Sequence, residues 1–496
     1  MNARGRLRAA LALAVPLLAA APCLAAQQGE PHIGYVYPAG AQAGTSLDVW
    51  VGGQFLRGVE TARFTGEGVR AEVVGHYRPL NNQQRGALRQ KLRQLSQRDP
   101  KATTALEQTE AEKDGITIPP LPGVPDLEEL DREQLAALQR RYFDPRAQPN
   151  SQIGETVVLR LRLEPGAGTG ARELRLITPA GASNPLRFEV GALTEYLEEE
   201  PNDRDADRGT MSWLPVVVNG QVTPGDVDRF RFHALAGTRL VVAAQARALI
   251  PYLADAVPGW FQATLALYDA AGRELAFVDD FRFNPDPVLA YEIPRNGEYV
   301  VEIRDSIYRG REDFVYRLSL GELPYLTSLF PLGGAAGERA ALRVGGWNLP
   351  TDWVVLERLR EEPGTQPVAV ATELGLTNPL PFALDELPER QEREPNGTPE
   401  SAQELELPVI VNGRIGEPGD LDVFRFEGRP GDRLVVEVVA RRLGSPLDSG
   451  IRPTDADGDQ PAGDGGPQGP RPRPLAHHPR PTLSPHAAQP RGALPT

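Results

Sequence analysis

The chain has 496 residues, too many for one ordinary domain, and its 50 Gly and 48 Pro favour many turns over long helices. A hydrophobic content of 40% is enough for packed cores, and the formal net charge of -14 argues against a partner with a phosphate backbone. The composition therefore predicts several turn-rich β domains, and the charge argues against nucleic-acid binding.

The first 26 residues have the layout of a cleavable export signal. Arg4, Arg6 and Arg8 precede an Ala/Leu run, and small residues follow it at Ala25-Ala26. The segment is too short and too interrupted by proline for a good membrane span, although an uncleaved anchor is the alternative. Cys23 is the single cysteine of the chain and would leave with the signal, so the mature protein would use neither disulfides nor thiol catalysis. We expect a secreted, periplasmic or cell-surface protein.

Internal repeats organise the rest of the chain. The stretch GDVDRFRF at 225–232 returns as GDLDVFRF at 419–426. A second repeat relates YPAGAQAGTSLDVWVGGQFL at 37–56 to FPLGGAAGERAALRVGGWNL at 330–349. The two kinds of repeat alternate along the chain, which predicts four modules in the order A-B-A-B.

All four modules are predicted to be β-sandwiches. Runs such as TVVLRLRL and EYVVEIRD alternate apolar and polar residues between clusters of Gly, Pro, Asn and Asp. The predicted boundaries are 31–192 for the first A module, 193–322 for the first B module, 323–391 for the second A module and 392–450 for the second B module.

The first A module holds an insertion at about 78–148 of a different character. Leu88, Leu92 and Leu95 recur at helical spacing, and a second run does the same from Leu127 to Tyr142. The Pro-rich connector ITIPPLPGVP separates them. We expect a helical hairpin, which could be a charged spacer or a docking arm for a partner.

Five separated motifs in the first B module resemble the bacterial pre-peptidase C-terminal domain. They are ExEPN at 198–202, NG at 219–220, GDVDRFRF at 225–232, LYDAAGRELAFVDD at 267–280 and IPRNGEYVVEI at 293–303. This resemblance implies a jelly-roll-like β-sandwich, generally non-catalytic, that is appended to secreted peptidases and other exported proteins.

The A modules resemble the immunoglobulin-like IPT/TIG domains. The resemblance lies in their Y/F-P-x-G-x-x-x-G start and in the later V-x-G-G-x-x-L. Similar tandem arrangements occur in large exported proteins of bacteria such as planctomycetes. The fold class implied is all-β and multidomain, with immunoglobulin-like and jelly-roll-like sandwiches in tandem.

The Asp-x-Asp pair of GDVDRFRF admits two interpretations. Residues i and i+2 of a strand point the same way, so Asp226 and Asp228 would share the side of Phe230 and Phe232 at the rim of the sandwich. Two carboxylates held together repel unless a cation or hydrogen bonds compensate them. The pair could therefore hold a cation, or it could cap the amides of a Gly-Asp turn.

The resemblance favours calcium as that cation. The pre-peptidase domain is similar to the collagen-binding domains of clostridial collagenases, in which acidic residues bind calcium. Calcium takes about six to eight oxygen ligands, more than two aspartates provide. The implied first site is Glu198, Glu200, Asn202, Asp203, Asp226 and Asp228. The matching second site is Glu392, Glu394, Asn396, Asp420 and Asp422, and it is expected to be weaker because Gly397 stands where the first copy has Asp203.

Catalytic motifs do not accompany these modules. None of the six histidines lies in HExxH, and no GxSxG elbow, Walker A loop or Rossmann GxGxxG follows a predicted strand. Asp269 and the pair Asp279-Asp280 are expected in hairpin loops, and His233 on a solvated face. Trp347 and Trp353 are predicted to be core residues, with an exposed platform for a sugar or protein ligand as the alternative.

The second B module departs from the first after Gly450. Aligning the copies places Pro453 and Pro461 where the first copy has the strand residues Leu267 and Leu275. We expect an incomplete sandwich followed by a disordered Pro/Arg-rich tail at 451–496. A shifted reading frame, a truncation or a genuine basic tail would each produce this pattern.

The sequence predicts an exported, non-catalytic modular protein that binds or adheres at the cell envelope or outside the cell. The alternative is the N-terminal accessory region of a larger secreted peptidase or other hydrolase. Intrinsic hydrolase activity is the third option. The expected partner is a protein or polysaccharide, the expected cofactor is calcium, and no membrane span is expected after signal cleavage.

Overall fold

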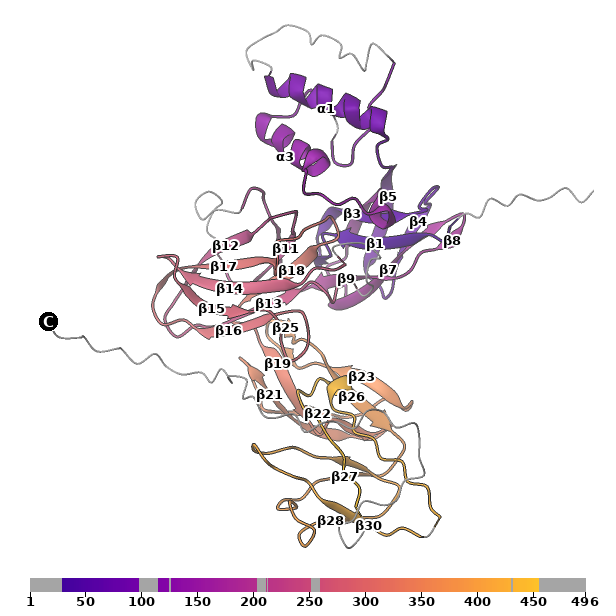
Figure 1. The fold of residues 1–496 in the computed structure, drawn as a ribbon, viewed down its shortest axis with the longest axis vertical. Coiled ribbons are helices and arrows are strands. Elements are labelled where there is room, and N and C mark those ends of the chain that lie inside the picture. Colours follow the sequence, from indigo (N-terminus) through magenta and orange to yellow (C-terminus); the bar gives the residue numbers. More distant parts are fainter. Residues whose placement is uncertain are drawn as a thin grey trace, which may run out of the picture. The chain divides into compact units, whose positions relative to one another are not determined.

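The structure is a computed structural model of the chain, and it describes residues 29–97, 115–124, 126–202, 211, 213–250, 259–429 and 431–454. Within these residues strands dominate and two α-helices interrupt them, which shows an all-β protein of several sandwich-like parts (Figure 1). The predicted signal at 1–26 and the tail from residue 455 lie outside the described residues. The chain separates into two compact units, one reaching Leu434 and including Val439–Pro446, the other formed by Val435–Val438 and the chain from Leu447.

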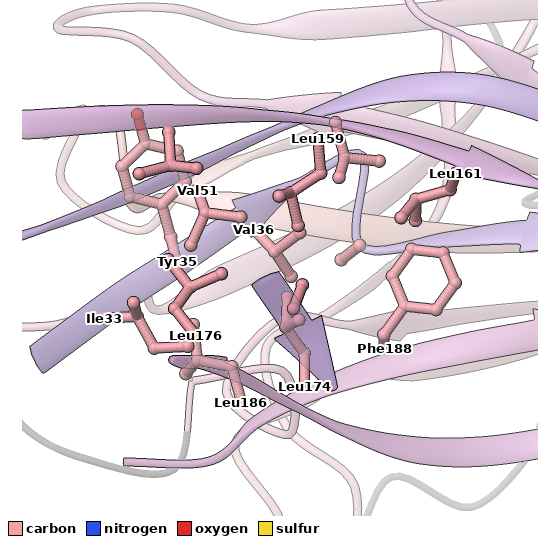
Figure 2. Close-up of a cluster of buried hydrophobic side chains, with 14 of the residues drawn as sticks. Ile33, Tyr35, Val36, Val51, Leu159, Leu161, Leu174, Leu176, Leu186 and Phe188 are labelled. Atoms are coloured by element: carbon pink, nitrogen blue, oxygen red, sulfur yellow. The ribbon is translucent and has the colours of Figure 1, made fainter. Parts of the chain in front are cut away.

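The first A module is a sandwich of two sheets with strand orders β1-β3-β6-β5 and β2-β9-β7-β4, and β8 pairs with β7. In β6, leucines at 159, 161 and 163 are buried and the arginines between them are exposed, so the period of two directs one face to the core. Figure 2 shows this core, in which Val36, Leu161 and Phe188 lie among the side chains between the sheets. The strands are β1 (His32–Tyr37), β2 (Gly40–Gln42), β3 (Ser46–Gln54), β4 (Thr61–Phe64), β5 (Val69–Tyr77), β6 (Glu155–Leu163), β7 (Gly170–Thr178), β8 (Gly181–Ala182) and β9 (Leu186–Gly191).

The predicted helical insertion lies between β5 and β6. It contains α1 (Asn82–Gln97) and α3 (Arg132–Phe143), followed by a short 3₁₀ turn at Ser151–Ile153. Asp131 caps α3 in a capping box with Gln134. Buried leucines of both helices form a cluster of their own, as the helical spacing predicted.

The first B module is also a two-sheet sandwich, with strand orders β10-β11-β18-β13-β16 and β12-β17-β14-β15. Phe232 is 0% exposed and lies in the core between the sheets. Arg229 and Arg231 of the same strand form ion pairs with Glu302 and Glu298 across the outer face. The strands are β10 (Thr194–Leu197), β11 (Val216–Gln221), β12 (Asp228–Ala234), β13 (Arg239–Gln245), β14 (Ala263–Asp269), β15 (Glu274–Val278), β16 (Val288–Glu292), β17 (Gly297–Asp305) and β18 (Val315–Gly321).

The second A module repeats the first with shorter strands. Its sheets have the orders β19-β21-β22 and β20-β26-β23, with a small β24-β25 pair. Leu342 and Phe382 are among its buried core residues. The strands are β19 (Tyr325–Phe330), β20 (Gly333–Ala335), β21 (Ala340–Trp347), β22 (Trp353–Leu356), β23 (Gly364–Val368), β24 (Ala371–Thr372), β25 (Gly375–Leu376) and β26 (Leu380–Asp385).

The second B module has short strands, and β27 is counted with it because it pairs with β29. It contains β27 (Glu389–Gln391), β28 (Gln403–Leu405), β29 (Ile410–Asn412), β30 (Phe424–Phe426) and a 3₁₀ turn at Arg441–Leu443. The parallel pair β27-β29 repeats β10-β11, in which Glu195 pairs with Val217 as Glu389 pairs with Ile410. The residues that match β13 form no strand in the described chain.

Candidate metal centre

Three carboxylates of the first B module converge at one end of the sandwich. Glu198 and Glu200 follow β10, and Asp228 is the first residue of β12. One oxygen of each lies within 4.8 Å of the others, and the Asp228 residue is 0% exposed. The structure therefore brings together three of the six residues predicted for the first site in a group that could hold a metal ion.

A tyrosine from β18 lies against this group. The Tyr316 hydroxyl donates to Asp228 Oδ2 at 2.6 Å, and it lies 3.1 Å from Glu198 Oε2. Gly220 pairs with Tyr316 across β11 and β18, and a Cβ at Gly220 would lie 2.1 Å from the Tyr316 hydroxyl. Only glycine leaves room for the tyrosine here, which explains the NG of PVVVNG.

Glu198 is held from two further directions. The Gln221 backbone N–H donates to Glu198 Oε1 at 2.7 Å, and the Tyr37 hydroxyl donates to the same oxygen at 3.3 Å. Tyr37 belongs to β1 of the first A module, so the two modules meet at this carboxyl group. These contacts fix the position of Glu198 beside Asp228.

The pKa values of both carboxyl groups are raised. Desolvation, followed by the charge of Glu200, raises the pKa of Glu198 to about 8. Desolvation, followed by the charge of Glu198, raises the pKa of Asp228 well above its ordinary value. A hydroxyl carries one proton, so the second contact of Tyr316 is best satisfied by a protonated Glu198 that donates to the tyrosine oxygen. A proton or a cation is thus needed to balance the group near neutral pH.

The remaining predicted ligands of the first site have different positions. Asp226 accepts hydrogen bonds from the Thr223 N–H at 3.0 Å and the Thr223 hydroxyl at 2.9 Å, and it lies outside the group of three. Asp226 therefore caps the turn, whereas Asp228 joins the acidic group. Asn202 is 4% exposed, and its amide oxygen has no hydrogen-bond partner. Asp203 lies outside the described residues.

A second acidic group repeats the first. Oxygens of Glu392, Glu394 and Asp422 lie within 4.8 Å of one another. The Arg414 N–H donates to Glu392 Oε1 at 2.5 Å, as Gln221 does in the first copy. The other two predicted ligands, Asn396 and Asp420, behave like their counterparts. The Asn396 amide oxygen is buried without a partner, and Asp420 accepts from the Gly416 N–H in a turn.

The chemistry of the first group fits a hard cation. All its donors are oxygens, the kind that calcium prefers, and no histidine or thiolate takes part. The Oδ1 of Asp228 and the amide oxygen of Asn202 are buried acceptors without a hydrogen-bond partner. Such acceptors are costly in a protein interior unless a ligand satisfies them. If a cation binds, Glu198, Glu200 and Asp228 would hold it, with Asn202 as a fourth ligand.

A buried ion pair beside the group was not predicted from the sequence. Arg317 follows Tyr316 on β18, and its guanidinium Nη1 lies 2.7 Å from Glu195 Oε2, with both side chains at most 7% exposed. The amide of Asn219 donates to the same glutamate at 2.8 Å. The signal was present in the sequence as polar residues inside the apolar strand FVYRLSL, where buried polar groups need partners.

Asp269, Asp279-Asp280 and His233 lie in turns or on exposed surface. Asp269 Oδ1 accepts from the Ala271 and Arg273 N–H groups in the β14-β15 hairpin, and these hydrogen bonds lower its pKa. Asp279-Asp280 are exposed in the connection from β15 to β16, which joins two different sheets and is therefore not the predicted hairpin loop. His233 is exposed, as the sequence predicted.

The tryptophans divide between the two predicted environments. Trp347 is partly buried and packs on Tyr325 with ring centroids 5.8 Å apart. Trp353 is 55% exposed, so its assignment to the core was wrong. An exposed position at the start of β22 leaves its ring available to a ligand.

Comparison with known proteins finds similarity over parts of this chain. No family model matches it. It is 31% identical over 106 residues to a probable subtilase-type serine protease of Deinococcus radiodurans, a stretch that makes up 21% of this chain and 14% of that protein. The pre-peptidase C-terminal domain of a collagenase from Bacillus anthracis is 12% identical and covers 23% of this chain and 98% of its own, with a TM-score of 0.17. The secreted serine protease VesC from Vibrio cholerae is 8% identical and covers 57% of this chain and 48% of its own, with a TM-score of 0.15.

Within the described residues, no helix has the length and apolar character that crossing a bilayer requires.

Proposed function

We propose that this chain is an exported, non-catalytic accessory region of a protease-type protein, and that calcium binds the acidic group of its first B module. The similarity to a subtilase-type protease supports the protease context. The order of pre-peptidase-like motifs supports the accessory role. The acidic group supports the calcium site.

The recurrence of the acidic group is the observation that carries the calcium proposal. In each copy, two glutamates two residues apart meet the second aspartate of the Gly-Asp-x-Asp turn, and a backbone N–H fixes the first glutamate. A fold that needed only a turn would not need three carboxylates within 4.8 Å, because like charges at that distance repel. Calcium would replace that repulsion with attraction, so we expect it to stabilise the module.

Calcium titration with thermal unfolding tests this site. Extracellular calcium modules bind with dissociation constants of about 0.1 to 1 mM, so about 5 mM calcium should add roughly 1 to 2 kcal/mol to the free energy of unfolding. Magnesium at the same concentration is the control, because it dehydrates reluctantly and prefers stricter octahedral geometry. Absence of any stabilisation at millimolar calcium would remove the metal from the proposal.

The accessory role is tested on the purified full chain. We expect no turnover of casein, of a panel of fluorogenic peptides or of common glycosides, with or without calcium. Turnover that survives further purification and is lost on substitution of a residue of this chain would show an enzyme instead.

A second candidate function, ligand binding in adhesion, is favoured by the exposure of Trp353. An exposed aromatic ring on a sheet can stack on a sugar or a protein side chain. Binding of the full chain to a polysaccharide and matrix-protein array should then fall on Trp353→Ala. Trp213, which is 75% exposed, supplies the matched control Trp213→Ala. Equal binding by both variants and the unaltered chain would contradict a role for Trp353.

A further inference from the structure

The outer face of α1 carries a row of arginines. Arg85, Arg89 and Arg93 follow one another at four-residue spacing and are exposed, whereas Leu88 and Leu92 between them are buried. Residues four apart lie on the same side of a helix, about 6 Å apart along its axis. The three side chains therefore form one line on the outer face, which we call the arginine stripe.

Acidic side chains do not balance the arginine stripe. The sequence of α1 contains four basic residues and no acidic one, although the whole chain has 67 Asp and Glu against 53 Lys and Arg. The fourth basic residue, Lys91, is buried and lies 2.9 Å from Glu128. None of the three arginines forms an ion pair with a carboxylate of the described residues.

The arginine stripe lowers the stability of its own helix. Like charges at four-residue spacing repel, and a cation near the start of a helix meets the positive end of the helix dipole. Arg85 is the fourth residue of α1. A helix that served only as a charged spacer would gain from a glutamate at one of these positions, which would pair with the remaining arginines. The composition of this face therefore favours a docking arm over a spacer.

Aromatic residues at the end of α3 hold two of the arginines in place. The guanidinium carbon of Arg89 lies over the Phe143 ring, 4.6 Å from its centroid, and that of Arg85 lies 5.6 Å from the same centroid. Arg85 Nη2 also donates to the Tyr142 carbonyl oxygen at 2.7 Å. A guanidinium that stacks on a ring keeps its N–H groups free for a carboxylate and has less side-chain entropy to lose on binding. Both arginines are thus preorganised for an anion.

Further positive charge lies at the end of α3. Arg141 is exposed, and its guanidinium carbon lies 5.8 Å from the centroid of the Tyr142 ring. Desolvation raises the pKa of Tyr142, the charges of Arg141 and Arg85 lower it, and the charge of Glu312 raises it. Glu312 is therefore a nearby carboxylate, but it forms no ion pair with an arginine of the described residues. Positive charge remains in excess around the arginine stripe.

We propose that the arginine stripe is a docking site for an extended acidic segment of another polypeptide, with carboxylates at alternate residues. Side chains two residues apart in an extended chain point the same way and lie about 6.5 to 7 Å apart, close to the step of about 6 Å between the arginines. Three successive carboxylates would then each accept hydrogen bonds from one guanidinium. This site makes the helical insertion a docking arm, and it does not depend on the accessory or calcium-binding roles.

An end-blocked peptide with the sequence GGEGEGEGG is the probe. Microscale thermophoresis with the labelled full chain, in calcium-free buffer at about 50 mM NaCl, should show saturable binding with a Kd of about 0.1 to 1 mM. Added salt should weaken this binding, because the charges are exposed. The peptide GGGEEEGGG has the same charge, but adjacent side chains of an extended chain point to opposite faces, so it should bind about threefold more weakly. Equal binding of the two peptides, or no saturable binding, would overturn the proposal.

A triple variant of the protein locates the site. Replacing Arg85, Arg89 and Arg93 together with Gln should weaken binding of the first peptide at least about tenfold, because it removes the charge-assisted hydrogen bonds.

The matched control also replaces three exposed arginines with Gln, at Arg57, Arg63 and Arg162 of the first A module. It changes the net charge by the same amount and should bind the peptide like the unaltered chain. Equal loss of binding in the two triple variants would show attraction to net charge alone, and this would overturn the proposal.

The single variant Arg93→Gln keeps the test independent of folding. Arg85 and Arg89 lie over Phe143, whereas no ring contact is found for Arg93 among the described residues. Arg93→Gln should weaken binding about threefold and leave the circular dichroism spectrum unchanged. An unaltered Kd would contradict the match of three arginines to three carboxylates.

A mannuronate trisaccharide, which also carries three carboxylates, distinguishes a polypeptide from a polysaccharide. It should bind more weakly than the first peptide. Tighter binding of the trisaccharide that is lost in the triple variant would identify an anionic polysaccharide as the occupant and overturn the proposal. The calcium-free buffer separates this test from the calcium titration, so each proposal can fail alone.

Discussion

The two B modules share one local arrangement but differ in what covers it. Both place two glutamates and an aspartate within 4.8 Å, with the same backbone donor to the first glutamate. In the first module Phe232 is 0% exposed, whereas the matching Phe426 of the second is 38% exposed. Leu240 and its counterpart Leu434 are 1% and 46% exposed. The acidic group therefore forms from local sequence, while the sandwich determines how far it is removed from water.

The pKa values follow this difference in cover. Desolvation is the largest cause in both modules, and it raises the pKa of Glu198 to about 8 but that of Glu392 to about 7. Tyr316 donates to the first aspartate and no described tyrosine does so in the second. The size of the pKa shift in this group therefore depends on the packing of distant strands, which the motif itself does not contain.

The largest expected effect concerns the phenylalanines. Phe232→Ala should destabilise the first B module by about 4 kcal/mol, because it removes a fully buried ring from the core. Phe426→Ala should cost less than about 1 kcal/mol, because that ring is already partly in water. Hydrogen exchange of peptides from β12 and β30, measured on the full chain, reports each module separately. Equal costs at both positions would mean that the second module is packed like the first.

The buried ion pair should come next. Arg317→Gln should destabilise the first B module by about 3 kcal/mol, because it leaves the buried carboxylate of Glu195 without its cation. The matched variant Glu389→Gln should change the stability of the second module little, since no arginine of the described residues is paired there. Denaturant titration followed by hydrogen exchange checks both. A cost below about 1 kcal/mol for Arg317→Gln would show that the Asn219 amide alone satisfies Glu195.

Much of this fold was predictable because its signals are local. Alternating apolar residues as in TVVLRLRL indicate strands, and the leucine spacing at 88, 92 and 95 indicates the inserted helix, both as found. The repeated motifs contain Glu198, Glu200 and Asp228, which the structure brings together, because each of them lies within a short run that recurs in this chain.

What could not be predicted depends on strand order. The β18 strand lies beside β11, about 95 residues earlier in the chain, so no local pattern reveals that Tyr316 would meet Asp228. The same holds for Tyr37, which reaches Glu198 from the first A module. Asp226 was placed with Asp228 because a strand was extended backward through a turn, and the turn directs Asp226 to Thr223 instead.

The pH dependence should also distinguish the modules. The raised pKa of Glu198 means that the folded module binds more protons than the unfolded chain between the ordinary glutamate pKa and about 8. The stability gained from that proton is fully present below the ordinary pKa and is lost as the pH rises through about 8, at up to about 1.4 kcal/mol per pH unit. For Glu392 the loss should end near pH 7.

Thermal unfolding and hydrogen exchange in EDTA from pH 5 to pH 9 measure this dependence. Glu198→Gln is the control and should flatten the profile of the first module. Calcium should oppose the loss at high pH, because the cation competes with the proton for the same carboxylates. A calcium effect that is larger at pH 6 than at pH 8.5 would contradict the shared site.

Asp228→Asn should have effects of opposite sign with and without calcium. In EDTA at high pH it should stabilise the first B module by about 1 kcal/mol, because it removes one of three mutually repelling carboxylates while the amide oxygen still accepts from Tyr316. With calcium it should abolish the stabilisation by the ion. Asp422→Asn makes the same change in the second module, and it should leave the calcium response of the first module unaltered. A destabilising effect of Asp228→Asn in both conditions would assign the aspartate a purely structural role.

The smallest expected effect tests the contact between the first A and B modules. Tyr37→Phe removes a long hydrogen bond of 3.3 Å to Glu198 Oε1, an oxygen that still receives the Gln221 N–H at 2.7 Å. The cost should therefore be below about 1 kcal/mol. A neutral hydroxyl donor favours the charged carboxylate, so its removal should raise the pKa of Glu198 further and shift the pH midpoint for calcium binding upward.

The second B module offers a control, because Phe330 already stands at the position that matches Tyr37. The guanidinium of Arg414 lies over the Phe330 ring, 3.6 Å from its centroid. Phe330→Tyr should therefore leave the pH profile of the second module unchanged. A midpoint that stays fixed in Tyr37→Phe would show that the first A module has no influence on the acidic group.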